Sequence, residues 1–173
     1  MLFRSGDKVL GRARCVEHAW QLRAEIRTRE PRLTLGGWAN PYSDPLGQIR
    51  FLADEQFNAA FYLTQIVSHL DAAPVERFLQ ALRARGLESL PGVYGVFFYR
   101  SANTTTLEQL RQFLPVPVEA LSAEFEAGAT PVEVCARTIR TMLDLGVRRF
   151  YVSNLPLRRA SATLNAILEQ VGA

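Results

Sequence analysis

Short apolar runs alternate with amphipathic stretches along this chain, and that alternation restricts its possible folds more than any other feature. The runs have the length and composition of strands buried on both faces of a parallel sheet. They are residues 2–3, 33–38, 61–67, 93–98 and 150–152. Each is followed by a stretch in which apolar side chains recur at helical spacing. The pattern therefore predicts an α/β fold built from right-handed strand-helix-strand units.

Local signals predict where the helices begin and end. The first helix is expected over 13–27, before Pro31. Side chains with the position or spacing of helix caps are Asp44, Asp71, Thr105 with Glu108, and Thr130 with Glu133. Pro45 suits the first turn of a helix, and Gly86 and Gly146 suit left-handed helix ends.

Such units can form either an open doubly wound sheet or a closed barrel. An open sheet usually carries a glycine-rich phosphate turn after its first strand, and neither GxGxxG nor GxxxxGK[ST] occurs in this sequence. The barrel is therefore favoured. We expect a single domain over 1–173 that forms about five strand-helix units of a (β/α)8 TIM-type barrel.

Charge and composition argue against several classes of protein. The formal net charge is +3, and the arginines are interleaved with Asp and Glu, which favours solvated helix faces over a nucleic-acid groove. No apolar stretch has the length of a membrane span or the form of a signal peptide, so we expect a cytoplasmic protein that binds no membrane. Cys15 and Cys135 lie outside any Cys/His cluster, so we expect reduced, buried thiols and no metal site.

Polar residues at the carboxyl ends of the strands are the candidates for chemistry, because the active sites of such barrels lie there. They are Asp7, Trp38, Asn40, Gln65, Ser68, His69, Tyr99, Arg100, Asn103, Ser153 and Asn154. Asp7 and Gln65 form the favoured pair, since a carboxylate and an amide suit a flat heterocycle with N–H donors and carbonyl acceptors. Each has a simpler interpretation, Asp7 as a turn or cap residue and Gln65 as an amide that satisfies loop backbone. His69 is either a general acid or base, or a loop residue beside a helix cap.

Four short motifs resemble the methylenetetrahydrofolate reductase family, in the family's order and at comparable spacing. They are Gly6-Asp7, Leu63-Thr64-Gln65, Pro91-Gly92-Val93 and Phe150-Tyr151-Val152-Ser153-Asn154. The segments 36–41, 61–69 and 93–103 look particularly like an actinobacterial branch of that family. The resemblance covers essentially the whole chain and implies strands 4 to 8 of the family's barrel.

The resemblance implies an oxidoreductase of one-carbon metabolism and methionine biosynthesis, which reduces methylenetetrahydrofolate to methyltetrahydrofolate. Asp7 would be catalytic, by contacting the pterin and stabilising the iminium cation. The residues expected to bind the folate substrate are Gln65, Tyr99 and Asn154. Trp38 and Asn40 stand where the family has Tyr-Pro-Glu, so they are the expected cofactor-binding positions, either for FAD or for direct use of NAD(P)H without a flavin.

The matching motifs begin at the family's fourth strand, so its first three units and the acidic residue of its first strand have no counterpart in this chain. About five parallel strands cannot close an eight-stranded barrel. We therefore expect self-association or pairing with a missing N-terminal half, which would cover the open strand edges. The alternatives to an incomplete reductase are a non-catalytic folate-binding or assembly module and an unrelated barrel enzyme acting on another heterocycle.

Overall fold

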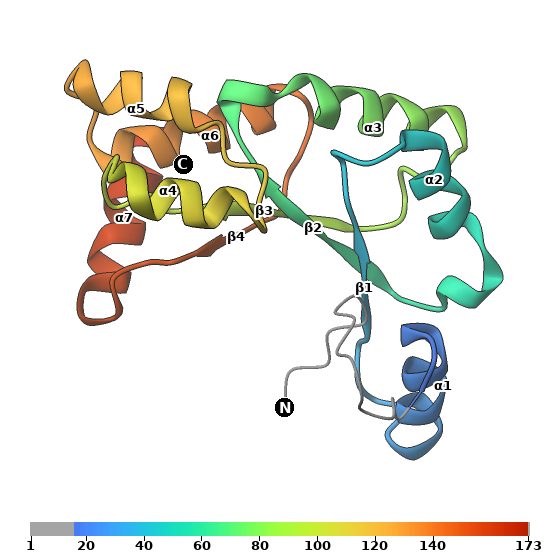
Figure 1. The fold of residues 1–173 in the computed structure, drawn as a ribbon. Helices are drawn as coiled ribbons and strands as arrows, with labels where there is room; N and C mark the ends of the chain where they lie inside the picture. The colour runs from blue at the N-terminus through green and yellow to red at the C-terminus, as the bar shows by residue number, and fades with distance from the viewer. Residues whose placement is uncertain (1–15, 173) are drawn as a thin grey trace.

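The computed structural model describes residues 16–172, which form a parallel sheet with helices packed against it (Figure 1). The strands are β1 (Gly36–Ala39), β2 (Phe61–Val67), β3 (Gly92–Phe97) and β4 (Phe150–Ser153). The helices are α1 (Ala19–Arg29), α2 (Pro45–Ala53), α3 (Ala73–Ala84), α4 (Thr104–Arg111), α5 (Val118–Glu126), α6 (Pro131–Asp144) and α7 (Ala160–Val171). Single 3₁₀ turns are η1 (Glu55–Phe57), η2 (His69–Asp71) and η3 (Leu157–Arg159). None of the helices described is both long and apolar enough to cross a membrane.

The sheet has four parallel strands in the order β1-β2-β3-β4, so neighbours in space are also neighbours in sequence. This confirms the predicted α/β class with parallel crossovers. A doubly wound sheet reverses its strand order at a switch point. The described part of the sheet contains no such reversal, and the carboxyl ends of all its strands lie along one edge.

One face of the sheet packs against the helices and forms the main core. Tyr62, Tyr94 and Val96 point from the strands into this core, where they meet apolar residues of α2, α3, α6 and α7. Tyr62 and Tyr94 are both 2% exposed and satisfy one another through their hydroxyl groups, whose oxygens lie 3.1 Å apart. Cys135 is also buried here, and burial raises the pKa of its thiol to about 12, as expected for an unreactive cysteine. Cys15 lies outside the described residues.

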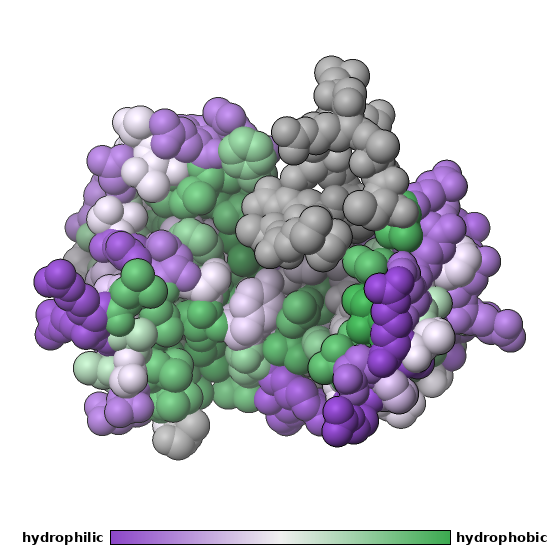
Figure 2. Space-filling view, turned by 90° about the horizontal axis from the view of Figure 1, so that it is seen from below, coloured by the Kyte–Doolittle hydropathy of each residue, from purple (hydrophilic) through white to green (hydrophobic). Residues whose placement is uncertain are grey.

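The opposite face of the sheet also carries apolar side chains. In the strand register, Trp38 lies beside Leu63 and Leu63 lies beside Val93, so the three form one row across β1, β2 and β3. Trp38 is 48% exposed, and Leu63 and Val93 are partly buried. Apolar residues gather on the underside of the molecule, opposite the layer of helices (Figure 2).

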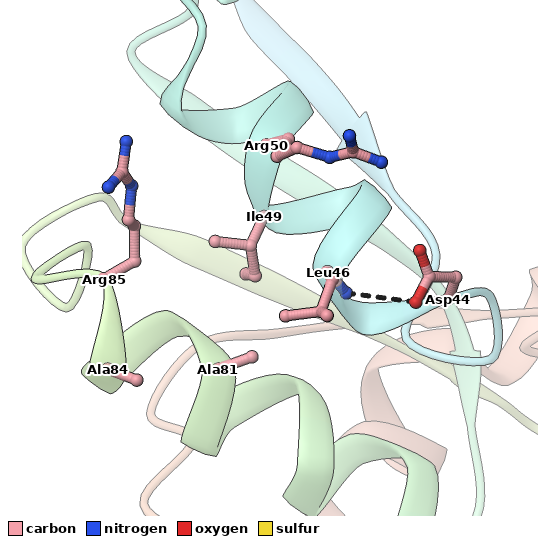
Figure 3. A pocket seen from close by; sticks show the side chains of 7 residues that line it. All are labelled: Asp44, Leu46, Ile49, Arg50, Ala81, Ala84 and Arg85. Atoms are coloured by element: carbon pink, nitrogen blue, oxygen red, sulfur yellow. Dashed lines mark hydrogen bonds between the residues drawn. The ribbon is translucent and has the colours of Figure 1, made fainter.

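Several local predictions are confirmed at helix ends. Asp44 caps α2 by accepting hydrogen bonds from the backbone amides of Leu46 and Gly47, at 3.3 and 2.7 Å (Figure 3). Thr130 and Glu133 form the predicted capping box at the start of α6.

Other predicted boundaries are wrong. Helix α1 begins at Ala19, and residues 16–18 are not helical. Asp71 does not cap α3; it belongs to the 3₁₀ turn η2, which is capped by Ser68 instead. Asn103, rather than Thr105, caps α4 by accepting from the amide of Thr106. In each case a nearer hydrogen-bonding side chain or a tight turn competes with the expected cap.

Helices α4 and α5 form a cap over the carboxyl ends of the strands. The sequence patterns do not distinguish α5 as a separate helix. Its side chains Val118 and Leu121 pack with Leu107 of α4 and with Tyr99, which follows β3. These residues belong to a second apolar cluster, separate from the main core. The predicted strand at 2–3 lies outside the described residues.

Strand β2 contains a bulge between Leu63 and Ile66, where its register with β3 shifts by one residue. The carbonyl of Thr64, displaced by the bulge, accepts a hydrogen bond from the Tyr151 hydroxyl of β4 at 2.8 Å. Tyr151 reaches β2 by crossing β3 above Gly95, where a Cβ atom would lie 2.5 Å from its hydroxyl oxygen. The missing side chain of Gly95 therefore permits this hydrogen bond across three strands.

Gly95→Ala tests this arrangement. The added methyl group must displace the Tyr151 ring, so we expect the free energy of unfolding to fall by roughly 1–3 kcal/mol. In a Tyr151→Leu background the obstructing hydroxyl is gone and the same substitution should cost clearly less, which is a measurable coupling between the two sites. Urea unfolding of the four proteins gives the comparison. An equal cost in both backgrounds would show that the Tyr151 ring does not depend on Gly95.

Candidate functional site

A hollow of about 270 Å³ opens at the carboxyl edge of the sheet. Asn40, Tyr42 and Gln65 line it from the ends of β1 and β2, and the connection between α4 and α5 supplies its other wall. The residues of that wall are Arg111, Phe113, Leu114 and Pro115. Two of the predicted site residues, Asn40 and Gln65, are thus brought together. Asp7, the predicted catalytic residue, lies outside the described residues.

Gln65 reaches the hollow because it occupies the β2 bulge. Its side-chain oxygen accepts a hydrogen bond from the backbone amide of Ile66 at 3.0 Å, which fixes the direction of the amide. The Thr64 hydroxyl accepts from the amide of Gly95 and donates to the carbonyl of Gln65, so the bulge is satisfied on both sides. The amide oxygen of Gln65 therefore has the backbone role foreseen in its simpler interpretation, while its side chain also lines the hollow.

Asn40 and Tyr42 form the β1 side of the hollow. The side-chain oxygen of Asn40 accepts from the amide of Tyr42 at 3.0 Å, and the backbone amide of Asn40 donates to Gln48 of α2 at 2.8 Å. The Tyr42 hydroxyl donates to the carbonyl of Asp71, and burial, together with the negative charge of Asp71, raises the pKa of Tyr42 to about 12. Tyr42 is consequently a neutral phenol at physiological pH.

The other predicted cofactor position, Trp38, lies away from this hollow. It points to the opposite face of the sheet, in the row with Leu63, and is half-exposed. A dinucleotide cofactor needs free backbone amides for its diphosphate, as helix N-termini often supply. In the connection after β1 those amides are occupied, because Gln48 binds the amide of Asn40 and the cap of α2 uses its first free amides. This connection therefore does not fit a dinucleotide diphosphate.

Tyr99 is only 7% exposed and packs in the second apolar cluster, with its ring 4.9 Å from that of Phe97. Burial, reinforced by the nearby Tyr42, raises the pKa of its hydroxyl. The structure places this side chain under the α4–α5 cap and does not bring it into the hollow. Its role in substrate binding stays a prediction.

Asn154 links the end of β4 to the end of β3 by a hydrogen bond. Its backbone is in the left-handed region, with φ 65°, and its side-chain amide donates to the carbonyl of Phe98 at 3.0 Å. The carbonyl of Asn154 accepts in turn from the guanidinium of Arg100, at 3.2 Å from both Nε and Nη2. These contacts position the two strand ends and lie apart from the hollow, so substrate binding by Asn154 also stays a prediction.

Arg111 and Phe113 are site residues that the sequence analysis missed. Arg111 ends α4 and forms ion pairs with Glu108 at 2.8 Å and Glu119 at 3.1 Å, while Phe113 is 78% exposed. Both line the hollow, so a cation and an exposed aromatic ring are present at its α4–α5 wall. In the sequence, however, both residues read as ordinary parts of an amphipathic helix.

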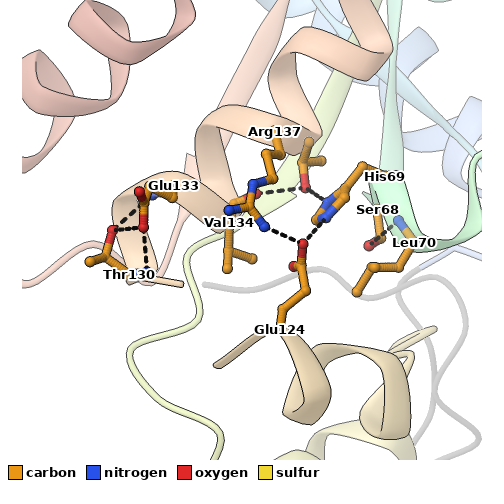
Figure 4. Close-up of polar contacts among 9 residues, drawn as sticks. Ser68, His69, Leu70, Glu124, Thr130, Glu133, Val134 and Arg137 are labelled. Carbon is orange, nitrogen blue, oxygen red and sulfur yellow. Dashed lines mark hydrogen bonds and ion pairs between the residues drawn. The ribbon is translucent and has the colours of Figure 1, made fainter. Parts of the chain in front are cut away.

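A polar network joins the end of β2 to helices α5 and α6 (Figure 4). His69 Nε2 lies 3.0 Å from Glu124 Oε1 on α5, and its Nδ1 lies 2.8 Å from the Thr138 hydroxyl on α6. Arg137 of α6 donates to the same Glu124 oxygen at 2.6 Å. His69, an open candidate in the sequence, is therefore a link between three elements rather than an isolated loop residue.

Two opposing effects act on Glu124. Burial is the largest and raises its pKa, but the hydrogen bonds and charges of His69 and Arg137 together lower it below the ordinary value. An ionised carboxylate can only accept a hydrogen bond, so His69 Nε2 is the donor to Glu124, while the Thr138 hydroxyl lies within hydrogen-bond distance of both His69 Nδ1 and the carbonyl of Val134. The network is thus an ionic latch that holds the cap to the sheet and to α6.

The chain matches no family model, and no curated protein matches its sequence. Within residues 16–172 there is also no group of three or more His, Cys, Asp or Glu side chains arranged to hold a metal ion. The features that bear on function are therefore the hollow, the latch and the sequence motifs.

Glu124→Gln tests the latch. Gln keeps an acceptor oxygen but lacks the negative charge that His69 and Arg137 share, so we expect the free energy of unfolding at neutral pH to fall by about 1–3 kcal/mol. Because folding lowers the pKa of Glu124, its contribution is complete above the ordinary value of 4.5 and is lost as the pH falls through the folded value. The difference between wild type and variant should accordingly shrink in acid.

Glu119→Gln is the matched control, since Glu119 lies on the same helix and its side chain is 82% exposed. It should change stability by less than about 0.5 kcal/mol at any pH. Urea titrations from neutral to acidic pH measure both variants. A constant difference for Glu124→Gln across that range would contradict the ionic character of the latch.

Proposed function

We propose that this chain is a methylenetetrahydrofolate reductase-type oxidoreductase, with the hollow at the carboxyl edge of the sheet as part of its folate site. The observation that carries the proposal is the meeting of Gln65 and Asn40 with Arg111 in one hollow at the ends of parallel strands. Two amides beside a cation suit a folate, which combines a hydrogen-bonding pterin with a negatively charged glutamate tail. The four sequence motifs support the same family.

The sheet supports a partial (β/α)8 barrel as the scaffold of this proposed enzyme. Sequential parallel strands with helices on one face are the arrangement within a barrel wall, and an eight-stranded barrel needs more strands than the four described. The apolar row of Trp38, Leu63 and Val93 then faces the barrel interior. Pairing with an N-terminal half, or self-association, would cover this row.

In the proposed reaction, the methylene carbon of the folate becomes an iminium when its bond to one nitrogen breaks and that nitrogen takes a proton. A hydride from a reduced nicotinamide would then convert the iminium to a methyl group. Gln65 would orient the pterin edge, and Asp7 would stabilise the cation. The connection after β1 fits the diphosphate of neither FAD nor NAD(P)H, so the nicotinamide would have to be bound by another part of the protein.

A non-catalytic folate-binding module is the second candidate. It is favoured by the composition of the hollow, whose lining among residues 16–172 includes amides, a cation and aromatic rings but no carboxylate. Such a lining can bind a folate without supplying a proton. Titration with methyltetrahydrofolate together with an assay of NADH oxidation separates the two, since only the enzyme does both.

Gln65→Ala should weaken the binding of methyltetrahydrofolate by roughly 5- to 150-fold, because a buried pterin donor or acceptor would lose its partner at a cost of about 1–3 kcal/mol. Isothermal titration calorimetry measures the change. Gln80→Ala, at an exposed position on α3, is the control and should leave the affinity unchanged. A parallel urea titration shows whether loss of the bond to Ile66 has unfolded the bulge. Unchanged affinity in a folded Gln65→Ala protein would remove Gln65 from the site.

Arg111→Ala distinguishes the two ends of the ligand. We expect it to weaken methyltetrahydrofolate binding by about tenfold, through loss of the contact with the glutamate carboxylates. A tetrahydropterin without the glutamate tail should bind wild type and variant equally. Calorimetry with both compounds provides the comparison, and Arg83→Ala on α3 is the charge-matched control. If the variant weakened both compounds equally, Arg111 would not be the tail contact.

A further inference from the structure

A groove of about 680 Å³ opens between α2 and α3, and Figure 3 shows the side chains that line it. Its walls are apolar: Leu46 and Ile49 of α2 face Ala81 and Ala84 of α3. Leu46 is 71% exposed, although a leucine of this kind is usually covered in a folded protein. The groove takes no part in the proposed folate site, with which it shares no lining residue.

The alanines determine the shape of the groove. Ala81 and Ala84 are three residues apart on one face of α3, so this helix presents a low surface opposite the larger Leu46. A second helix can approach closely where small residues line a groove between ridges. An open groove with an exposed leucine beside two alanines suits an apolar helix face with anchors at i, i+3 and i+4 better than it suits a small molecule, because small-molecule sites normally enclose their ligand.

The charges of the groove indicate the charge of the partner that it would bind. Arg50 stands on the α2 side and Arg85 at the end of α3, both exposed, and neither forms an ion pair with another residue between 16 and 172. The acidic residue of the groove, Asp44, is already engaged in capping α2. The groove therefore presents two available positive charges beside an apolar floor. A partner with acidic side chains next to its apolar anchors complements both features.

We propose that the α2–α3 groove is a docking site for an acidic amphipathic helix of another protein, about two to three turns long. The apolar face of that helix packs on Leu46, Ala81 and Ala84, and its acidic residues lie near Arg50 and Arg85. The proposal is independent of the folate site, so the two can fail separately.

The test is a selection from a displayed library of helical peptides that have apolar residues fixed at i, i+3, i+4 and i+7 and all other positions randomised. We expect the selected peptides to be enriched in Asp and Glu near one end. A fluorescently labelled selected peptide should bind wild type at least about tenfold more tightly than the Arg50→Glu/Arg85→Glu variant, and less tightly as salt is raised. Ala84→Trp, which fills the groove without changing its charge, should abolish binding.

Arg140→Glu/Arg158→Glu is the matched control, because it reverses two exposed arginines on other elements and should leave peptide affinity unchanged. Urea unfolding confirms that each variant is folded. The proposal fails if no peptide is selected, if the selected peptides are basic, or if they bind the groove variants as well as wild type. The alternative occupant is a second copy of this chain, and sedimentation of the chain alone tests it. If the chain self-associates and Arg50→Glu/Arg85→Glu abolishes that association, the groove binds a second copy and the proposal is wrong.

Discussion

The hydrogen bond from the Tyr151 hydroxyl to the carbonyl of Thr64 closes the bulge of β2, and the carboxyl edge of the sheet is organised around that bulge. Before it, Tyr62 points to the helices and Leu63 to the opposite face; after it, Ile66 pairs with Gly95 and the alternation is reversed. A regular strand would have no additional residue at this point. The bulge thus supplies the position from which Gln65 enters the hollow.

Two kinds of interaction hold the cap of α4 and α5 in place, and they differ in how strongly they depend on pH. Leu107 and Leu121 bury apolar surface against Tyr99, which is insensitive to pH. The latch fixes the position of α5 more specifically, because one oxygen of Glu124 must lie within hydrogen-bond distance of both His69 and Arg137. Its second oxygen, Oε2, is buried without a hydrogen-bond partner among the described residues, so the latch gains less than a fully satisfied network would.

Sequence reasoning succeeded where a short segment determines its own structure. Asp44 with Pro45, and Thr130 with Glu133, form their caps within a few residues, so spacing alone located them. It failed where segments distant in the sequence are in contact. His69 of η2 and Thr138 of α6 are 69 positions apart, and no local sequence pattern in either element predicts their hydrogen bond. The position of Gln65 beside the hollow could be expected, because the carboxyl ends of parallel strands lie along one edge of the sheet, whereas the position of Arg111 depends on the unpredicted turn between α4 and α5.

Helix α2 connects the outer groove with the inner edge of the sheet. Its residue Gln48 accepts the backbone hydrogen bond of Asn40, which lines the hollow, while Leu46 and Arg50 of the same helix line the groove on the other side. A helix of this length moves as one rigid element, since its backbone hydrogen bonds run from end to end. A partner that shifts α2 would therefore also shift the side-chain oxygen Oε1 of Gln48 relative to the backbone amide of Asn40. This bond of 2.8 Å is one physical route from groove to hollow, and it couples the two sites only if α2 takes different positions with and without the partner.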